Sequence, residues 1–295
     1  MVKARRAVFE IYLDYVQHYG GAIHVRSLLR LCEEMGFSAV AVRAALCRLA
    51  QQDWLERSVF DKKSYYALTQ MGRDRVEEAA PRIFAPRAEK WDGQWTILSY
   101  SLPEKLRQHR ERLRRELIWL GFGSLTPASW IIPKPAVELT LKHLAERRLD
   151  KYVNLFRARH VNSQAGTDLV ARCWDLSAVQ ACHRDFIRAW KPVWRSYQSR
   201  FNAGHPPSDN VCFASKMRLL YEYGRFLYLD PGLPSELLPE GWLANDAWRV
   251  FRDCYFLLAE RALAFFEENF QGPPHTEAEK RKGHERVMHR VLELT

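Results

Sequence analysis

The feature that most constrains the fold is the stretch from residue 38 to residue 69, SAVAVRAALCRLAQQDWLERSVFDKKSYYALT. Val42, Leu46 and Leu49 recur in it at i, i+4 and i+7, the spacing that places side chains on one face of a helix. The stretch therefore predicts a helix with one buried stripe and an outward face that carries Arg43 and Arg48. Strand-like residues follow this helix directly.

A second helix is predicted just before it, over residues 26–35. Gly36 interrupts the two helical patterns, and Ser38 is a suitable N-cap for the later helix. A turn of this length between two helices is typical of a helix-turn-helix motif. The residues expected to pack the two helices together are Leu28, Leu29 and Leu31.

A basic hairpin is predicted after the helices. Residues 54–59 and 65–68 have strand composition, and the polar residues 61–64, DKKS, separate them as a turn would. Thr69 is a suitable cap for a further helix. The order helix, turn, helix, hairpin predicts a winged helix-turn-helix. Exposed Lys and Arg are ordinary on any surface, but in this order they favour DNA binding. The candidate DNA contacts are Ser38, Val40, Arg43, Ala44, Cys47, Arg48, Arg57, Lys62, Lys63 and Tyr65.

The charge balance is compatible with a polyanionic partner. Lys and Arg total 45 against 35 Asp and Glu, a formal charge of +10. No apolar run approaches the ~20 residues that span a membrane, and the first residues alternate charged with apolar side chains, unlike a signal peptide. We therefore expect a cytoplasmic protein with no membrane association. The six cysteines form no CxxC pair, so free thiols are expected rather than a metal site.

The length of 295 residues exceeds one small domain. We expect an α+β protein with a winged-helix domain, a middle domain, a mostly helical C-terminal domain and a polar, poorly packed tail. Strands and helices alternate in the middle part in the order βαββαβ, with the helices at residues 103–120 and 135–148, which predicts a ferredoxin-like fold. The predicted domain ranges are 1–85, 90–170, 174–272 and 273–295.

Two segments outside the winged part carry a strong local pattern. The run LPEKLRQHRERLRREL is the densest in charge and has two interpretations: a solvated helix face with pairs such as Glu111 with Arg115, or a phosphate-binding surface. In the C-terminal part, four aromatic residues recur at helical spacing and predict a packed core. They are Phe186, Trp190, Trp194 and Tyr197.

Four sequence strings, in three parts of the chain, carry a family resemblance. They are VRAALCRLAQQDWL with YYALTQMG in the winged part, WDGQWTILSYSLPEKLRQHRERLRRELIWLGFGSLTPASWIIP in the middle, and YGRFLYLDPGLPSELLPEGW near the end. On these strings the chain resembles the PaaX-type family of bacterial repressors of phenylacetic acid degradation. The resemblance implies a homodimer whose winged helices bind an inverted-repeat DNA operator. It also implies an acyl-CoA effector, phenylacetyl-CoA in the best-known branch, that releases the DNA.

The resemblance leaves the effector site open. The basic run offers Arg107, Arg110 and Arg114 as candidates for the CoA phosphates. The alternative is a DNA-binding regulator that responds to a different acyl-CoA or to a partner protein.

A distant alternative is a metal-dependent nuclease, because the middle domain of this family is similar to the small CRISPR-associated ferredoxin-like nucleases. Those nucleases use an aspartate at the end of the first strand, where this chain has Ser99, Tyr100 and Ser101, and Asp92 precedes the strand. No paired carboxylates are visible to hold Mg²⁺. We therefore expect no enzymatic activity and no cofactor.

Overall fold

The computed structural model describes residues 4–84, 90–134, 136–146, 148–161, 166–274 and 277–293. The chain divides into two compact units. Unit 1 contains residues 1–85, 186–224 and 246–295, and unit 2 contains residues 86–185 and 225–245. The C-terminal half of the chain therefore contributes segments to both units.

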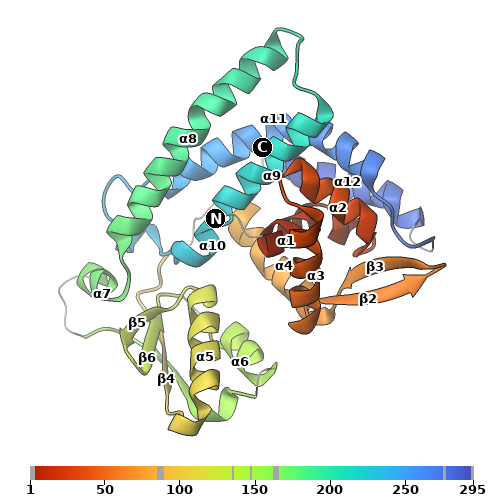
Figure 1. Ribbon diagram of the computed structural model, residues 1–295. Coiled ribbons are helices and arrows are strands. Elements are labelled where there is room, and N and C mark those ends of the chain that lie inside the picture. The colour runs from red at the N-terminus through yellow and green to blue at the C-terminus, as the bar shows by residue number, and fades with distance from the viewer. Residues whose placement is uncertain are drawn as a thin grey trace. The chain divides into compact units, whose positions relative to one another are not determined.

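Unit 1 begins with a three-stranded antiparallel sheet and the helices around it. The elements are α1 (Ala4–Asp14), the 3-10 helix η1 (Val16–Tyr19), β1 (Ala22–His24), α2 (Val25–Glu34), α3 (Ala39–Gln51), β2 (Leu55–Phe60), β3 (Lys63–Leu68) and α4 (Gln70–Phe84). The two predicted helices and the two predicted strands are all present (Figure 1). Strand β1 was not predicted; it pairs with β3, which gives the order β1-β3-β2.

The predicted helix caps are confirmed. The hydroxyl of Ser38 accepts a hydrogen bond from the backbone N–H of Ala41 at 3.3 Å, at the start of α3. The hydroxyl of Thr69 accepts one from the N–H of Gly72 at 3.0 Å, at the start of α4. These bonds satisfy N–H groups that would otherwise have no partner in the first turn, so both helices begin where the sequence places their caps.

The stretch PRIFAPR, residues 81–87, predicts a break at the end of the preceding helix, but the predicted break at Pro81 is wrong. Pro81 lies inside α4, which continues to Phe84. Phe84 is buried and packs against Phe251 and Tyr255, with ring centroids 6.1 and 5.3 Å apart. A proline inside a helix costs about 3 kcal/mol, and burial of the last turn of α4 offsets that cost. Residues 85–87 of the predicted break lie outside the described residues.

Long helices complete unit 1. They are α8 (Leu176–Asn202), of which residues 176–185 belong to unit 2, α9 (Asp209–Tyr223), α11 (Ala244–Asn269) and α12 (Glu277–Glu293). The predicted aromatic core on α8 is confirmed: Phe186 and Trp190 are buried, while Trp194 and Tyr197 are half-buried.

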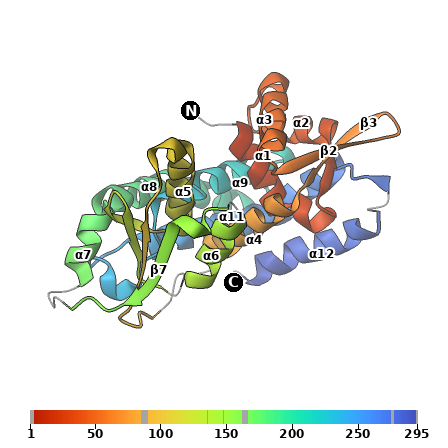
Figure 2. The same cartoon turned by 90° about the horizontal axis from the view of Figure 1, so that it is seen from below.

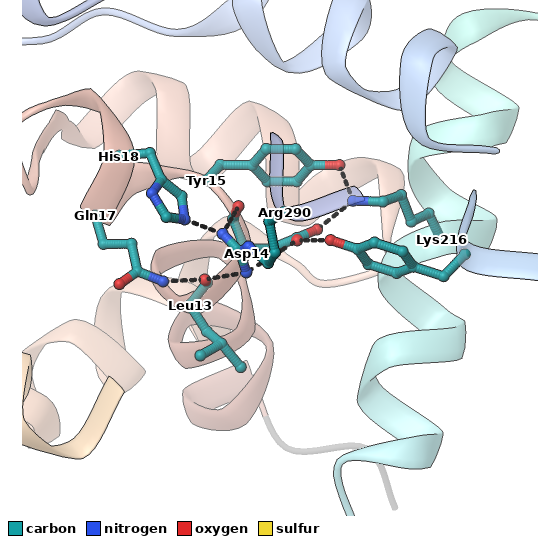
Figure 3. Close-up of polar contacts among 8 residues, drawn as sticks. Leu13, Asp14, Tyr15, Gln17, His18, Lys216 and Arg290 are labelled. Atoms are coloured by element: carbon teal, nitrogen blue, oxygen red, sulfur yellow. Dashed lines mark hydrogen bonds and ion pairs between the residues drawn. The ribbon is translucent and has the colours of Figure 1, made fainter. Parts of the chain in front are cut away.

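A buried ionic cluster joins four helices of unit 1 (Figure 3). Asp14 is fully buried and accepts hydrogen bonds from the ammonium of Lys216, at 2.5 Å, and from the hydroxyl of Tyr255. Lys216 also donates to the hydroxyl of Tyr15 at 2.9 Å. Burial by itself would raise the pKa of Asp14, but Lys216 and Arg290 hold that pKa below its usual value. The carboxylate is therefore ionised, and its charge is compensated inside the protein.

The predicted loose tail is in fact a packed helix. Val287 of α12 is 1% exposed, and a Cβ on Gly283 would come within 2.7 Å of the Tyr19 ring, so α12 packs closely on η1. Arg290 donates to the backbone carbonyls of Leu13 and Asp14, each at 3.1 Å. The expectation of poor packing was wrong because a few small, apolar and cationic side chains suffice to dock a helix whose other residues are polar.

Unit 2 contains the predicted βαββαβ sequence. Its elements are β4 (Trp95–Tyr100), η2 (Glu104–Leu106), α5 (Arg107–Leu120), β5 (Gly123–Thr126), β6 (Ser129–Ile132), α6 (Val137–Glu146), η3 (Asp150–Tyr152), β7 (Val153–Ala158), α7 (Gly166–Cys173), α10 (Phe226–Leu229) and η4 (Ser235–Leu237). The sheet is antiparallel with the order β5-β6-β4-β7. Figure 2 shows α5 and α6 on the same face of this sheet. This is a ferredoxin-like arrangement, so that prediction is confirmed.

The other face of this sheet is covered by α7, which was not predicted, and by η4. Trp95 and Ile131 on the sheet pack with Val170 and Leu237 from the two covering segments. Alternate strand residues point to opposite faces. Both faces of the sheet are therefore buried, which explains the near-continuous apolar composition of β4.

Candidate nucleic-acid interface

Helix α3 presents one exposed face that carries no acidic side chain. Val42, Leu46 and Leu49 are buried, as predicted. The outward residues follow the complementary spacing and are Val40, Arg43, Ala44, Cys47 and Arg48. Val40 is 79% exposed. Within the described part of the chain, neither arginine side chain forms an ion pair. The face therefore combines small and apolar groups with two uncompensated cations.

The hairpin of β2 and β3 has a shorter turn than predicted. Asp61 and Lys62 both have positive φ, 46° and 59°, and form the two-residue turn. Lys63 and Ser64, predicted in the turn, are the first residues of β3, and Lys63 pairs with Phe60. A two-residue turn with positive φ at both positions matches the right-handed twist of the strands, whereas a four-residue loop would not require it. The tip extends away from α3 (Figure 1).

Three of the candidate DNA contacts, all of them cations, lie exposed on this hairpin. Arg57 on β2 donates to the hydroxyl of Ser64 at 2.9 Å, which holds its guanidinium against the strand pair. Lys62 and Lys63 extend from the turn and from the start of β3. The hairpin also exposes Val59 and Phe60, at 62% and 54%, two apolar residues that the sequence-based selection left out. Their position next to the predicted turn is the feature of the sequence that could have indicated their exposure.

Tyr65 was wrongly predicted as a contact. It is 2% exposed, and its ring packs 5.3 Å from that of His24 on the neighbouring strand. The pairing of Ser58 with Tyr65 sets which face of β3 each side chain occupies, and a shift by one residue would exchange the faces. Tyr65 therefore supports the hairpin from inside.

The three candidate effector arginines lie along α5 in unit 2. Arg110 donates to the carbonyl of Leu102 at 3.3 Å, and Arg114 lies 3.7 Å from the carboxylate of Glu111. Arg107 is exposed. They are separated by three and four residues, so they share one side of the helix.

A hollow of about 740 Å³ lies elsewhere in unit 2, next to α7. None of the three α5 arginines lines it. Its walls combine aromatic and aliphatic groups with Arg172 and two acidic residues, and they are formed by residues 167, 168, 171–177, 237 and 239. The structure thus does not bring the candidate phosphate contacts together with this hollow.

The described residues offer no arrangement for metal chemistry. Among them, no group of three or more His, Cys, Asp or Glu side chains could hold a metal ion. Asp92 is paired with Arg157 at 2.5 Å, and β4 ends at Tyr100 between two serines. None of the helices within the described ranges is long and apolar enough to cross a bilayer.

Comparison with known proteins gives consistent matches along the chain. Residues 3–72 match the family model described as PaaX-like protein, residues 88–170 that of the PaaX protein central Cas2-like domain, and residues 174–268 that of the PaaX-like protein C-terminal domain. The transcriptional repressor PaaX of Escherichia coli (strain K12) is 30% identical over 271 residues, which cover 90% of this chain and 84% of that protein.

A solved structure has a similar fold. The uncharacterized protein Rv0674 from Mycobacterium tuberculosis matches with a TM-score of 0.50 and 23% sequence identity. The match covers 90% of this chain and 99% of that one. At this identity the likeness concerns the fold alone.

Proposed function

Because the chain belongs to the PaaX family, we propose that it is a transcriptional repressor that binds double-stranded DNA. One observation carries the proposal: the exposed, acid-free face of α3 stands beside a hairpin with three exposed cations. A helix with small outward residues can enter a major groove, and cations beside it can contact the backbone. The relative in Escherichia coli is itself named a transcriptional repressor.

We assign two roles within a winged helix-turn-helix formed by residues 22–68. The residues that face base edges or adjacent phosphates are Ser38, Val40, Arg43, Ala44, Cys47 and Arg48. Arg57, Lys62 and Lys63 contact the backbone and contribute affinity without sequence preference. A homodimer would place two α3 helices ~34–36 Å apart, in successive major grooves of an inverted repeat. The predicted domain ranges and a cytoplasmic location are part of this proposal.

The effector in this proposal is an acyl-CoA, and phenylacetyl-CoA is the first to test. Its support is the family resemblance, together with the row of Arg107, Arg110 and Arg114 on α5, whose charges suit CoA phosphates. Such a ligand releases DNA only if it binds one conformation more tightly than the other, typically by ~1–3 kcal/mol. A different acyl-CoA or a partner protein is the alternative signal.

The test is a mobility shift of the purified protein on its own upstream intergenic DNA at fixed salt. Phenylacetyl-CoA, free phenylacetate and other acyl-CoAs are titrated in separate lanes. Release by phenylacetyl-CoA alone supports the whole proposal. If the protein–DNA complex persists with every acyl-CoA, the proposal of DNA binding stands and the proposal of an acyl-CoA effector is wrong. Cleavage of the duplex that depends on Mg²⁺ would instead favour a nuclease.

A further inference from the structure

A second feature of unit 1 combines the hairpin with a segment from the far end of the chain. A hollow of about 590 Å³ is lined by the first turn of α2, the start of β3 and the end of α11. Its lining residues are His24, Val25, Arg26, Ser27, Arg30, Lys62, Lys63, Ser64, Glu268, Asn269, Phe270 and Gln271. Lys62 and Lys63 therefore belong both to the proposed DNA-contacting hairpin and to this hollow.

The charges around the hollow are mostly positive. Arg30 pairs with Glu33 and Glu34, at 3.3 and 2.6 Å. The other three cations are exposed and have no ion pair within the described ranges; they are Arg26, Lys62 and Lys63. Glu268 is the only acidic residue in the lining. The hollow thus presents an excess of uncompensated positive charge, which attracts anions.

The floor of the hollow offers hydrogen-bond donors. His24 is the N-cap of α2, but its side chain makes no capping bond, so the first N–H groups of this ten-residue helix lack a side-chain acceptor. The His24 ring is 5% exposed and has no hydrogen bond to another side chain within the described residues. Burial, and then the charges of Arg26 and Lys63, lower its pKa. Arg26 and Lys63 therefore both disfavour protonation of the His24 ring.

The end of α11 is attached firmly to this floor. The N–H of His24 donates to the carbonyl of Gln271 at 2.8 Å, and the N–H of Gln271 donates to the hydroxyl of Ser27 at 3.1 Å. The hydroxyl of Ser27 accepts that bond, so its own proton can still be donated into the hollow. The amide of Asn269 donates to the carbonyl of Phe265 at 2.9 Å. The wall is thus built before any ligand arrives.

We propose that this hollow binds a phosphate group, through Arg26, Lys62, Lys63 and the first turn of α2. Phosphate suits the site because helix N-termini and unpaired cations together recognise its charge and its oxygens. The identity of the donor molecule rests on the proposed function: in a DNA-bound repressor, the phosphate belongs to the DNA backbone. Glu268 then opposes binding, and the end of α11 takes part in the DNA contact although it lies about 200 residues beyond the hairpin.

The decisive variant is Glu268→Gln, because a gain in affinity cannot come from misfolding. Removing one exposed like charge near a bound phosphate should tighten binding roughly two- to fivefold, on the operator and on an unrelated duplex alike. The control is Glu260→Gln, an exposed glutamate eight residues earlier on α11 and therefore about 12 Å away along the axis. Screening makes that change nearly silent at about 0.1 M salt. Fluorescence anisotropy of labelled duplexes measures both.

The second variant is Arg26→Ala, measured over a range of salt concentrations. The plot of log Kobs against log salt has a negative slope. Loss of one phosphate contact should make that slope less steep by about 0.9. The control is Arg249→Ala, an exposed arginine paired with Asp246 about 28 Å before Glu268 on α11, which should leave the slope unchanged. If both test variants match their controls while the wild type binds DNA, the phosphate site is wrong and the repressor proposal stands.

Titration with pyrophosphate tests the phosphate site independently of DNA binding. If the wild-type protein binds no duplex, the repressor proposal fails, and isothermal titration with sodium pyrophosphate then shows whether the hollow binds phosphate. Tighter pyrophosphate binding by Glu268→Gln than by Glu260→Gln would retain a phosphate site with a small-molecule source. Equal binding, or none, would overturn it.

Discussion

Glu10 in α1 should make the stability of unit 1 depend on pH near neutrality. Its side chain is 1% exposed, and burial raises its pKa from 4.5 to about 7, although Arg6 donates to it at 3.1 Å and opposes the change. Asp14, one turn later, raises the pKa further. The second carboxyl oxygen of Glu10 is buried without a hydrogen bond to any described residue.

The sign and the size of the effect follow from these values. Between pH 4.5 and about 7 the folded state holds a proton on Glu10 that the unfolded state has lost, so the free energy of unfolding falls as pH rises through this window. At roughly 1.4 kcal/mol for each pH unit, the full cost is about 3 kcal/mol and is reached above pH 7. Below pH 4.5 the carboxyl is neutral in both states and the cost vanishes.

Glu10→Gln removes the ionisation and keeps the shape. We expect the variant to match the wild type within about 1 kcal/mol near pH 4.5 and to exceed it by up to about 3 kcal/mol at pH 8. Urea unfolding followed by circular dichroism measures the difference at each pH, and it corresponds to a midpoint change of about 1 M or more. Glu260→Gln, which changes an exposed glutamate, is the control.

The pH dependence of the difference is the critical result. If Glu10→Gln differs from the wild type by the same amount at both pH values, then Glu10 does not ionise with a raised pKa in the folded protein. Burial would then not raise the pKa of Glu10, whatever the absolute stability of the variant.

Three further predictions concern the interface and the core. Arg48→Ala should weaken operator binding by about 1–3 kcal/mol and leave binding to an unrelated duplex nearly unchanged. Fluorescence anisotropy with both duplexes measures the two affinities. An equal loss of affinity for both duplexes would contradict a role of Arg48 in sequence readout. Lys62→Gly should raise the urea midpoint of unfolding, because it relieves up to about 1 kcal/mol of backbone strain at φ 59°. The same variant should make the negative slope of log Kobs against log salt less steep by about 0.9. A lower midpoint would contradict the assigned turn. Lys216→Met should destabilise unit 1 by about 3–5 kcal/mol, because it leaves the buried charge of Asp14 without its closest cation. A loss below about 1 kcal/mol would show that Arg290 and Tyr255 suffice.

The interface divides between what is local in sequence and what is not. The exposed face of α3 could be predicted because its side-chain directions depend only on helical spacing, and the same spacing defines its buried stripe. Tyr65 could not be placed, because the face it occupies depends on the register of β3 against β1 and β2. The hollow beside Lys63 could not be predicted from the sequence either, because part of its wall is formed by distant residues near Gln271.

The caps, the periodic helices and the βαββαβ order of unit 2 could be predicted from the sequence, because each of these depends on neighbours within a few residues. Only the tertiary contacts make α4 continue through Pro81, dock α12 through Val287, and bury the titratable groups of Glu10 and Lys216. They also decide how the C-terminal half is divided between the two units. Burial is a property of contacts between distant segments, and a local pattern records only which side chains could be buried, whereas the partner that buries them is set by the folded chain.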